Sequence, residues 1–227
     1  MIIQVLANLK EEGYLKRGRH PTIAPFFAGA NVAFRRKALA ELGGFDPECV
    51  TGEDCDLCAR LSSRHWELYL KSDAVVAHHN PSTLRRVFRQ WYGYGRYHPY
   101  VFAKHNERAL ELYARIGRPI DGERHVCLFY RRVPVGIVVF LTRFLLMHVT
   151  LLAAVGVWLM GWHVAGGIMI AVAAGLISAY AWPDVRRWGV RGIGFAMVRY
   201  VADLALFLGG FVGGLRQKML YLSATID

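Results

Sequence analysis

The stretch GEDCDLCARL, residues 52–61, decides the fold around it because it joins a cluster of acids to the start of a helix. Three of its first five residues are carboxylates, and Leu57 and Leu61 follow at the i, i+4 spacing that places both on one helix face. The acids fall where the positive end of the helix dipole stabilises them, as in ordinary capping. A carboxylate aimed from there into a cleft can also take a proton from a substrate hydroxyl. This stretch alone leaves both interpretations open.

Four further motifs accompany residues 52–57 in a fixed order. They are GANVAFRR at 29–36, GGFD at 43–46, HHNPST at 78–83 and RQWYGYG at 89–95. In this order and spacing the set resembles the second half of the catalytic domain of membrane-associated family 2 glycosyltransferases, which are inverting enzymes of the GT-A fold. Each motif alone is weak, whereas five in register, over residues 22–97, are specific.

The resemblance implies roles for individual residues. Asp54 matches the aspartate that deprotonates the acceptor hydroxyl as general base, and Glu53 beside it is the second expected catalytic residue. The residues expected to bind substrate or shape the cleft are Gly29, Asn31, Asp56, Gln90 and Trp91. The run from Arg89 departs from the Q-x-x-R-W pattern of processive members, which argues against synthesis of long polymers.

The resemblance also implies partners and a cofactor. These are a nucleotide-sugar donor, a lipid or glycan acceptor, and Mg²⁺ or Mn²⁺ held by a D-x-D site. No D-x-D precedes residue 52, and only 25 residues precede Phe26. We therefore expect the donor-binding half and the metal site to be absent, as in a truncated or split enzyme whose second chain supplies that half. Such a lobe would leave a sheet edge exposed.

Charge is concentrated in the middle of the chain. The 227 residues carry a formal net charge of +11, but residues 1–80 balance ten basic against ten acidic side chains. Residues 81–132 carry eleven basic against four acidic side chains, and residues 133–227 carry seven against three. A basic segment before an apolar tail favours anionic lipid head groups or phosphate-bearing substrates. No nucleic-acid-binding module is recognisable, so nucleic acid is not an expected partner.

The hydrophobic pattern divides the chain into three parts. Residues 1–81 are expected to form the acceptor-side half of a GT-A domain, residues 82–132 a basic amphipathic, interfacial helical segment, and residues 133–227 a transmembrane helical region. The predicted fold class is therefore a partial α/β GT-A-like lobe followed by interfacial helices and two or three transmembrane helices.

The candidate spans are residues 133–160, 164–182 and 192–215. Three arginines at 186–191 predict a cytoplasmic turn after the second span, and hence an integral membrane protein with its soluble lobe on the cytoplasmic face. A third full span would place Arg216 and Lys218 outside, against the same rule; a re-entrant or interfacial segment would remove the conflict.

The third candidate span carries two further signals. Arg199 and Asp203 lie at i and i+4, and charges at membrane depth usually pair or face the bundle interior. The glycines at 209, 210, 213 and 214 form overlapping G-x-x-x-G pairs, which are suited to close helix packing.

Local patterns predict the remaining elements. Helices are expected over 1–21 with a basic loop at its end, over 35–42, and from residue 82; strands are expected over 67–70 and 74–77. Residues 26–34 read either as the acceptor side of the cleft or as a buried strand with a glycine bend. Apolar residues from Leu84 to Trp91 recur with helical spacing, as in a helix in a membrane interface or one docked on the protein core.

Cysteines and histidines give weaker signals. Cys55 and Cys58 form a C-x-x-C without the second pair that a zinc site needs, so free thiols are expected. His78 and His79 end a predicted strand, where such a pair is usually structural but could contact a metal or a diphosphate.

Two other classes of function stay open from the sequence. One is a non-catalytic membrane subunit, or an inactive remnant, that binds a partner glycosyltransferase. The other is a basic membrane-surface protein in which residues 82–132 matter and the acids do not.

Overall fold

The computed structural model describes residues 13–15, 29–70, 74–77, 79–116 and 124–224. The amino-terminal lobe contains a two-stranded antiparallel sheet of β1 (Gly13–Leu15) and β2 (Leu68–Leu70), the short 3-10 helix η2 (Gly29–Asn31), and the helices α1 (Arg36–Leu42) and α2 (Glu53–Ser63). Its apolar core consists of Ala38, Leu57, Cys58, Leu61 and Leu68. The predicted inward face of α2 is therefore confirmed.

Helix α1 ends where the sequence predicts. Gly43 adopts a left-handed conformation with φ of 71°. Its N–H donates to the Ala40 carbonyl at 3.3 Å, and the Gly44 N–H donates to the Leu39 carbonyl at 2.9 Å. Two other local predictions are wrong: residues 13–15 are a strand and not part of a helix, and residues 74–77 form no strand. Of the two interpretations of residues 26–34, the buried strand is wrong, because residues 29–34 form a 3-10 turn and coil. The rest of 1–21, residues 26–28 and His78 lie outside the described residues.

Helix α3 (Leu84–His105) follows the lobe. The Thr83 hydroxyl caps its start by accepting a hydrogen bond from the Arg86 N–H at 3.3 Å. The helix was predicted, and it begins at Leu84 and continues past Pro99.

A four-stranded sheet follows α3 in the order β4-β3-β5-β6. Strands β3 (Ala109–Ile116) and β4 (Arg124–Arg132) are antiparallel, whereas β5 (Gly136–Leu141) is parallel to β3, and β6 (Met219–Leu222) is parallel to β5. The prediction of a helical segment over 82–132 is therefore wrong beyond His105. Aromatic and aliphatic side chains fill the core of this sheet: Tyr113, Val138, Phe140, Met219 and Tyr221.

Three helices follow β5 in the sequence and precede β6: α4 (Arg143–Leu159), α5 (His163–Trp188) and α6 (Arg191–Arg216). The predicted single span over 133–160 is wrong, because its first part is strand β5 and only the rest is helix. By length and composition alone, α5 and α6 could cross a membrane, while α4 has 17 residues and is shorter. The two later candidate spans are thus confirmed as long apolar helices.

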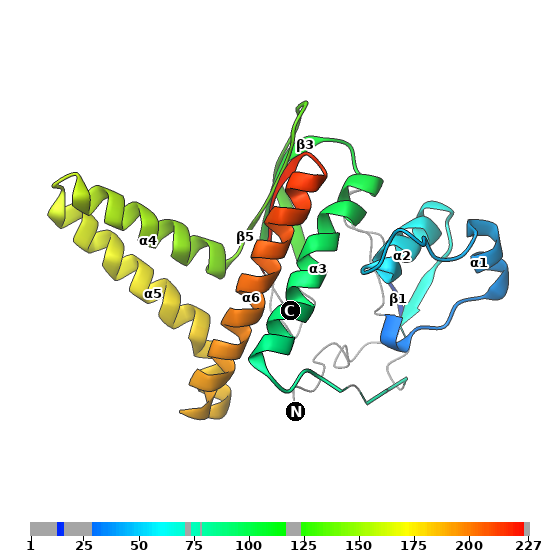
Figure 1. The fold of residues 1–227 in the computed structure, drawn as a ribbon, viewed down its shortest axis with the longest axis horizontal. Coiled ribbons are helices and arrows are strands. Elements are labelled where there is room, and N and C mark those ends of the chain that lie inside the picture. The colour runs from blue at the N-terminus through cyan, green and yellow to red at the C-terminus, as the bar shows by residue number, and fades with distance from the viewer. Residues whose placement is uncertain (1–12, 16–28, 71–73, 78, 117–123, 225–227) are drawn as a thin grey trace.

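Helices α3 and α6 lie side by side in the middle of the molecule (Figure 1). A Cβ at Gly95 would overlap the Leu206 carbonyl, and one at Gly209 or Gly213 would overlap the backbone of Tyr92 or Arg96. The predicted close packing through the G-x-x-x-G glycines is confirmed, and its partner is α3. Figure 1 also shows α1 and α2 on one side of this pair, while α4 and α5 project away on the other.

Candidate active site

The carboxylate of Asp54 lies where two of the sequence motifs meet. Gly52, with φ of 82°, turns the chain into α2, and the half-buried Asp54 follows in the first turn. Its Oδ2 accepts a hydrogen bond from the Gly29 N–H at 2.8 Å, and its Oδ1 accepts one from the Cys55 N–H at 2.8 Å. The Cys55 side chain also hydrogen-bonds to this carboxylate, and the two oxygens together offer about four acceptor positions. Two backbone donors therefore orient the carboxylate without exhausting its capacity as an acceptor.

Glu53 and Asn31 lie beside the same junction. A Cβ at Gly29 would lie 3.7 Å from Glu53 Oε1 and 3.7 Å from Asp54 Oδ2, so both acids approach this glycine. Asn31 donates from Nδ2 to the Ala74 carbonyl at 2.6 Å. The structure thus brings together four predicted site residues and attaches segment 74–77 to them.

Asp56 has a different environment, because its side chain is fully buried. It accepts hydrogen bonds from Arg60 at 2.8 Å and faces Lys104 Nζ at 2.8 Å and His105 Nε2 at 2.9 Å. Burial raises the pKa of this carboxyl, but the hydrogen bonds from Lys104, His105 and Arg60 outweigh burial, and the pKa lies below its ordinary value. The geometry favours a positioning role for Asp56 over the substrate contact that the sequence predicts.

Lys104 connects Asp56 to the GGFD motif. Its Nζ also lies 2.5 Å from Asp46 Oδ2, which accepts a further hydrogen bond from the Tyr100 hydroxyl at 3.1 Å. The hydrogen bond from Lys104 is the main cause that lowers the pKa of Asp46 to about 2. Arg60 completes the connection by donating to the Leu42 and Gly44 carbonyls at 3.0 and 2.9 Å.

Tyr100, Lys104 and His105 were not predicted as site residues. The i, i+4 spacing of Tyr100 and Lys104 places them on one face of α3, but their carboxylate partners lie more than forty positions earlier. No local pattern specifies such a pairing.

His98 and Val101 belong to the part of α3 that faces the start of α2. A Cβ at Gly52 would lie 3.3 Å from Val101 Cγ2. Burial lowers the pKa of His98 to about 4, although the negative charge of Asp54 opposes this shift. His98 is therefore neutral at pH 7 and close enough to Asp54 to sense its charge.

Gln90 and Trp91 lie further along α3. Gln90 donates to the Tyr94 hydroxyl at 2.7 Å, and the Trp91 ring packs edge-on against Tyr94 with centroids 5.3 Å apart. Seven residues separate Trp91 from His98, which is about 10 Å along a helix. Both predicted residues therefore lie on the same helix as His98, about two turns from it, and the contacts described for them are with Tyr94 of the same helix.

Comparison with known proteins identifies the family. The family model described as glycosyl transferase family group 2 matches residues 18–182, well over half of the chain. The chain belongs to this family.

The curated relatives found are glycosyltransferases too. Two are pre-mycofactocin glycosyltransferases of Mycobacterium tuberculosis, from strains CDC 1551 / Oshkosh and ATCC 25618 / H37Rv. Each is 30% identical over 93 residues, which cover 41% of this chain and 20% of the relative. The match therefore spans a fifth of the length of these glycosyltransferases. No solved structure matches the chain.

The residues described do not fit the divalent metal expected of a family 2 glycosyltransferase. No group of three or more His, Cys, Asp or Glu side chains in the described ranges could hold a metal ion. Asp54 and Asp56 spell D-x-D, but the cationic groups of Arg60 and Lys104 already occupy the Asp56 carboxylate. Cys55 and Cys58 form no disulfide, as predicted, and burial raises the pKa of Cys55.

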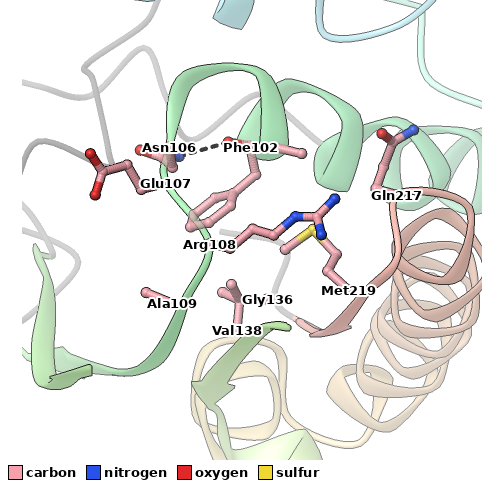
Figure 2. A pocket seen from close by; sticks show the side chains of 10 residues that line it. Phe102, Asn106, Glu107, Arg108, Ala109, Gly136, Val138, Gln217 and Met219 are labelled. Carbon is pink, nitrogen blue, oxygen red and sulfur yellow. Dashed lines mark hydrogen bonds between the residues drawn. The ribbon is translucent and has the colours of Figure 1, made fainter. Parts of the chain in front are cut away.

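A cavity of about 210 Å³ opens elsewhere, between the end of α3 and the sheet (Figure 2). Its lining includes Phe102, Asn106, Arg108, Gln217 and Met219. Asn106 donates from Nδ2 to the Phe102 carbonyl at 2.9 Å, which closes the end of α3 over the cavity. None of the residues predicted from the motifs lines it.

Proposed function

We propose that this protein takes part in inverting glycosyl transfer from a nucleotide sugar to a lipid-linked or cell-envelope acceptor, with Asp54 as general base. The observation that supports this most directly is the Asp54 carboxylate, held at a loop-to-helix junction by the Gly29 N–H at 2.8 Å. A general base needs a fixed position and a free lone pair within hydrogen-bond reach of the proton that it abstracts.

In the proposed reaction the acceptor O–H bond breaks, and its proton passes to a carboxylate oxygen of Asp54. The acceptor oxygen forms a bond to the anomeric carbon of the donor from the side opposite the diphosphate. The bond between that carbon and the diphosphate oxygen breaks, and the nucleoside diphosphate leaves with the bonding electron pair. One displacement inverts the configuration at the anomeric carbon.

Other residues of the chain support this base. Glu53 shapes the negative environment beside Asp54, while Asp56 fixes the first turn of α2 through Arg60 and Lys104. Gly29 and Asn31 form the acceptor side, and Gln90 and Trp91 contact the acceptor further out along α3. The donor is bound by residues outside the described ranges or by a second chain, because this match covers a fifth of the related glycosyltransferases. Any Mg²⁺ or Mn²⁺ belongs to that donor site.

We also propose that the protein is membrane-bound, with the amino-terminal lobe, which carries Asp54 (the Asp54 lobe), on the cytoplasmic face. This proposal rests on the long apolar helices and on the exposed arginines at 186, 187 and 191 between α5 and α6. A cytoplasmic lobe would meet nucleotide sugars and a lipid-linked acceptor at the same surface.

The test is transfer by the purified full chain in nanodiscs, with a panel of UDP- and GDP-sugars and Mg²⁺ or Mn²⁺. We expect Asp54→Asn to lower transfer by about 10²- to 10⁴-fold, the usual contribution of a general base. Glu48→Gln is the matched control, because Glu48 is exposed and its side chain lies outside the site. Full activity of Asp54→Asn would contradict the role of Asp54. Absence of transfer by the parent chain, alone and with a donor-binding partner, would favour the non-catalytic subunit.

A further inference from the structure

The hairpin of α4 and α5 differs from α6 in what surrounds it. No charged side chain occurs between Arg143 and Asp184. Large apolar side chains are exposed around both helices of the hairpin, including Leu152 at 73%, Leu159 at 81% and Val164 at 80%. Exposed apolar surface on this scale marks a binding surface for another apolar phase. The hairpin also projects away from the rest of the molecule (Figure 1).

The length of α5 fits a lipid bilayer, and the 17 residues of α4, about 26 Å of helix, reach the lower limit for a spanning helix. Trp158 and Trp162 lie at its tip, and Trp182 and Trp188 lie at its base. Twenty residues separate Trp162 from Trp182, which is about 30 Å of helix and equals the thickness of the hydrocarbon core. Tryptophan is enriched at both membrane interfaces, so the two pairs occupy the positions expected for a hairpin that crosses the whole bilayer.

The base of the hairpin is polar. Arg143 donates to the Ala179 carbonyl at 3.1 Å, and Arg199 of α6 pairs with Asp184 of α5 at 2.7 Å. The Tyr180 hydroxyl donates to Asp203. Exposed arginines at 186, 187 and 191 follow at the turn, where they complement the phosphates of anionic lipid head groups. This polar belt marks the level of one membrane surface.

The carboxyl-terminal half of α6 is covered by protein on two sides. Gly209 and Gly213 press against the backbone of α3, a helix that carries Arg85, Arg86, Arg89 and Arg96. Gly210 and Gly214 contact Tyr221 and Met219 of β6, which is an edge strand of the described sheet. Open sheet edges do not occur in the hydrocarbon region, because their backbone groups would lack hydrogen-bond partners. This half of α6 is therefore excluded from the bilayer core.

The exposed surface of α6 supports the same conclusion. Five of its six exposed large apolar residues, Ile193, Met197, Leu208, Phe211 and Leu215, fall on one stripe at helical spacing. The sixth, Phe195, lies off this stripe and packs against the Trp188 ring, with centroids 5.5 Å apart. A single stripe is typical of a helix that lies in the membrane interface, whereas a spanning helix meets lipid over a wider face.

We propose that α4 and α5 alone cross the bilayer as a two-helix hairpin, and that α6 stays on the same side as the Asp54 lobe. This inference rests on the membrane association proposed above. It places Arg216 and Lys218 on the side of the other basic turns, which removes the conflict with the positive-inside rule that three spans would create.

The test uses single cysteines at three turns of the full chain: Met160→Cys at the hairpin tip, Val190→Cys between α5 and α6, and Arg216→Cys at the end of α6. All three positions are exposed. They are introduced after the four natural cysteines are replaced by alanine. If that background fails to fold, the parent chain is used and its own labelling is subtracted. A membrane-impermeant maleimide is applied to intact and to permeabilised cells.

We expect Met160→Cys to be labelled in intact cells. Val190→Cys and Arg216→Cys should be labelled at least tenfold more strongly after permeabilisation than in intact cells. Labelling of Arg216→Cys in intact cells would overturn the proposal in favour of three spans. Protection of Met160→Cys in intact cells, in a protein that resists alkaline carbonate extraction, would overturn it in favour of a re-entrant hairpin. Extraction of the parent chain by carbonate would instead refute the membrane association itself.

Discussion

The two faces of α3 are held in opposite ways. On one face Gly95 allows the helix backbone to touch that of α6, with no side chain between them. On the other face Tyr100, Lys104 and His105 reach out to the carboxylates of Asp46 and Asp56. The first contact requires a residue without a side chain and does not change with pH, whereas the second depends on the charges of the side chains. Helix α3 therefore packs tightly against α6 on one side, and on the other side it contacts the amino-terminal lobe through charged groups that titrate with pH.

The largest effect is expected at the glycine contact. Gly213→Val places side-chain atoms against the Arg96 carbonyl, which cannot move without breaking α3. Overpacking costs 1–3 kcal/mol in ordinary cores, so we expect a loss of about 3 kcal/mol or more in the free energy of unfolding. Denaturant unfolding in detergent, followed by circular dichroism, measures it.

Gly194→Ala is the matched control in the same helix. Nothing lies within 4 Å of a Cβ at this position, and alanine is the better helix former by about 1 kcal/mol. We expect a small gain in stability. Equal losses in both variants would show that the α3–α6 contact contributes nothing specific.

The next largest effect is expected at Asp56. Asp56→Asn removes the charge that Arg60 and Lys104 surround, and breaking a buried ion pair costs 3–5 kcal/mol. Because Lys104 is 32% exposed and can be partly solvated, we expect the lower end, about 3 kcal/mol. The same unfolding measurement applies. An unchanged midpoint would mean that the charged face of α3 adds no stability.

A smaller, pH-dependent effect is expected from Lys104→Met. In the parent protein the pKa of Asp46 is lowered from 3.8 to about 2, so its contribution to stability is complete above pH 3.8 and is lost as the pH falls through about 2. Without Lys104 the pKa of Asp46 rises toward 3.8, and the acid unfolding transition should move to higher pH. Tryptophan fluorescence during acid titration measures this shift, and Lys37→Met, at an exposed lysine of α1, should leave it in place.

The smallest effect on stability is expected at an exposed ion pair outside these contacts of α3. Glu107 and Arg132 form an ion pair of 2.8 Å in which the side chains are 66% and 73% exposed. Exposed pairs of this kind contribute about 0–1 kcal/mol. Glu107→Gln should therefore leave the free energy of unfolding almost unchanged, and a loss as large as that of Asp56→Asn would show that burial does not separate the two kinds of ion pair.

The same comparison explains what the sequence could predict. The G-x-x-x-G spacing predicts a close helix contact because the glycines that form it are near one another in the sequence. It does not indicate that the partner helix is α3. The motif order predicts the junction of Gly29, Glu53 and Asp54. Lys104 was missed because its two carboxylate partners are far away in the sequence, and charge alone does not select among distant acids.

The strands of the four-stranded sheet were missed for a related reason. The apolar run GIVVFL of β5 has the composition of a membrane helix, and it was assigned to a span with α4. The boundary was available in the sequence, because Thr142 caps α4 by accepting from the Leu145 N–H at 3.2 Å. In β3 the fully buried Glu111 interrupts the alternation that would have indicated a half-buried strand.

The position of β6 sets an order of events during synthesis. Its register pairs Gly136 with Met219, so residues 142–218 must be made before the sheet gains this strand. The apolar α4 and α5 leave the ribosome while the sheet is still unfinished, and long-range parallel pairing is slow. We therefore expect the hairpin to enter the membrane first and the sheet to close afterwards. A nascent chain arrested before residue 219 should already resist carbonate extraction while its sheet core is still sensitive to protease.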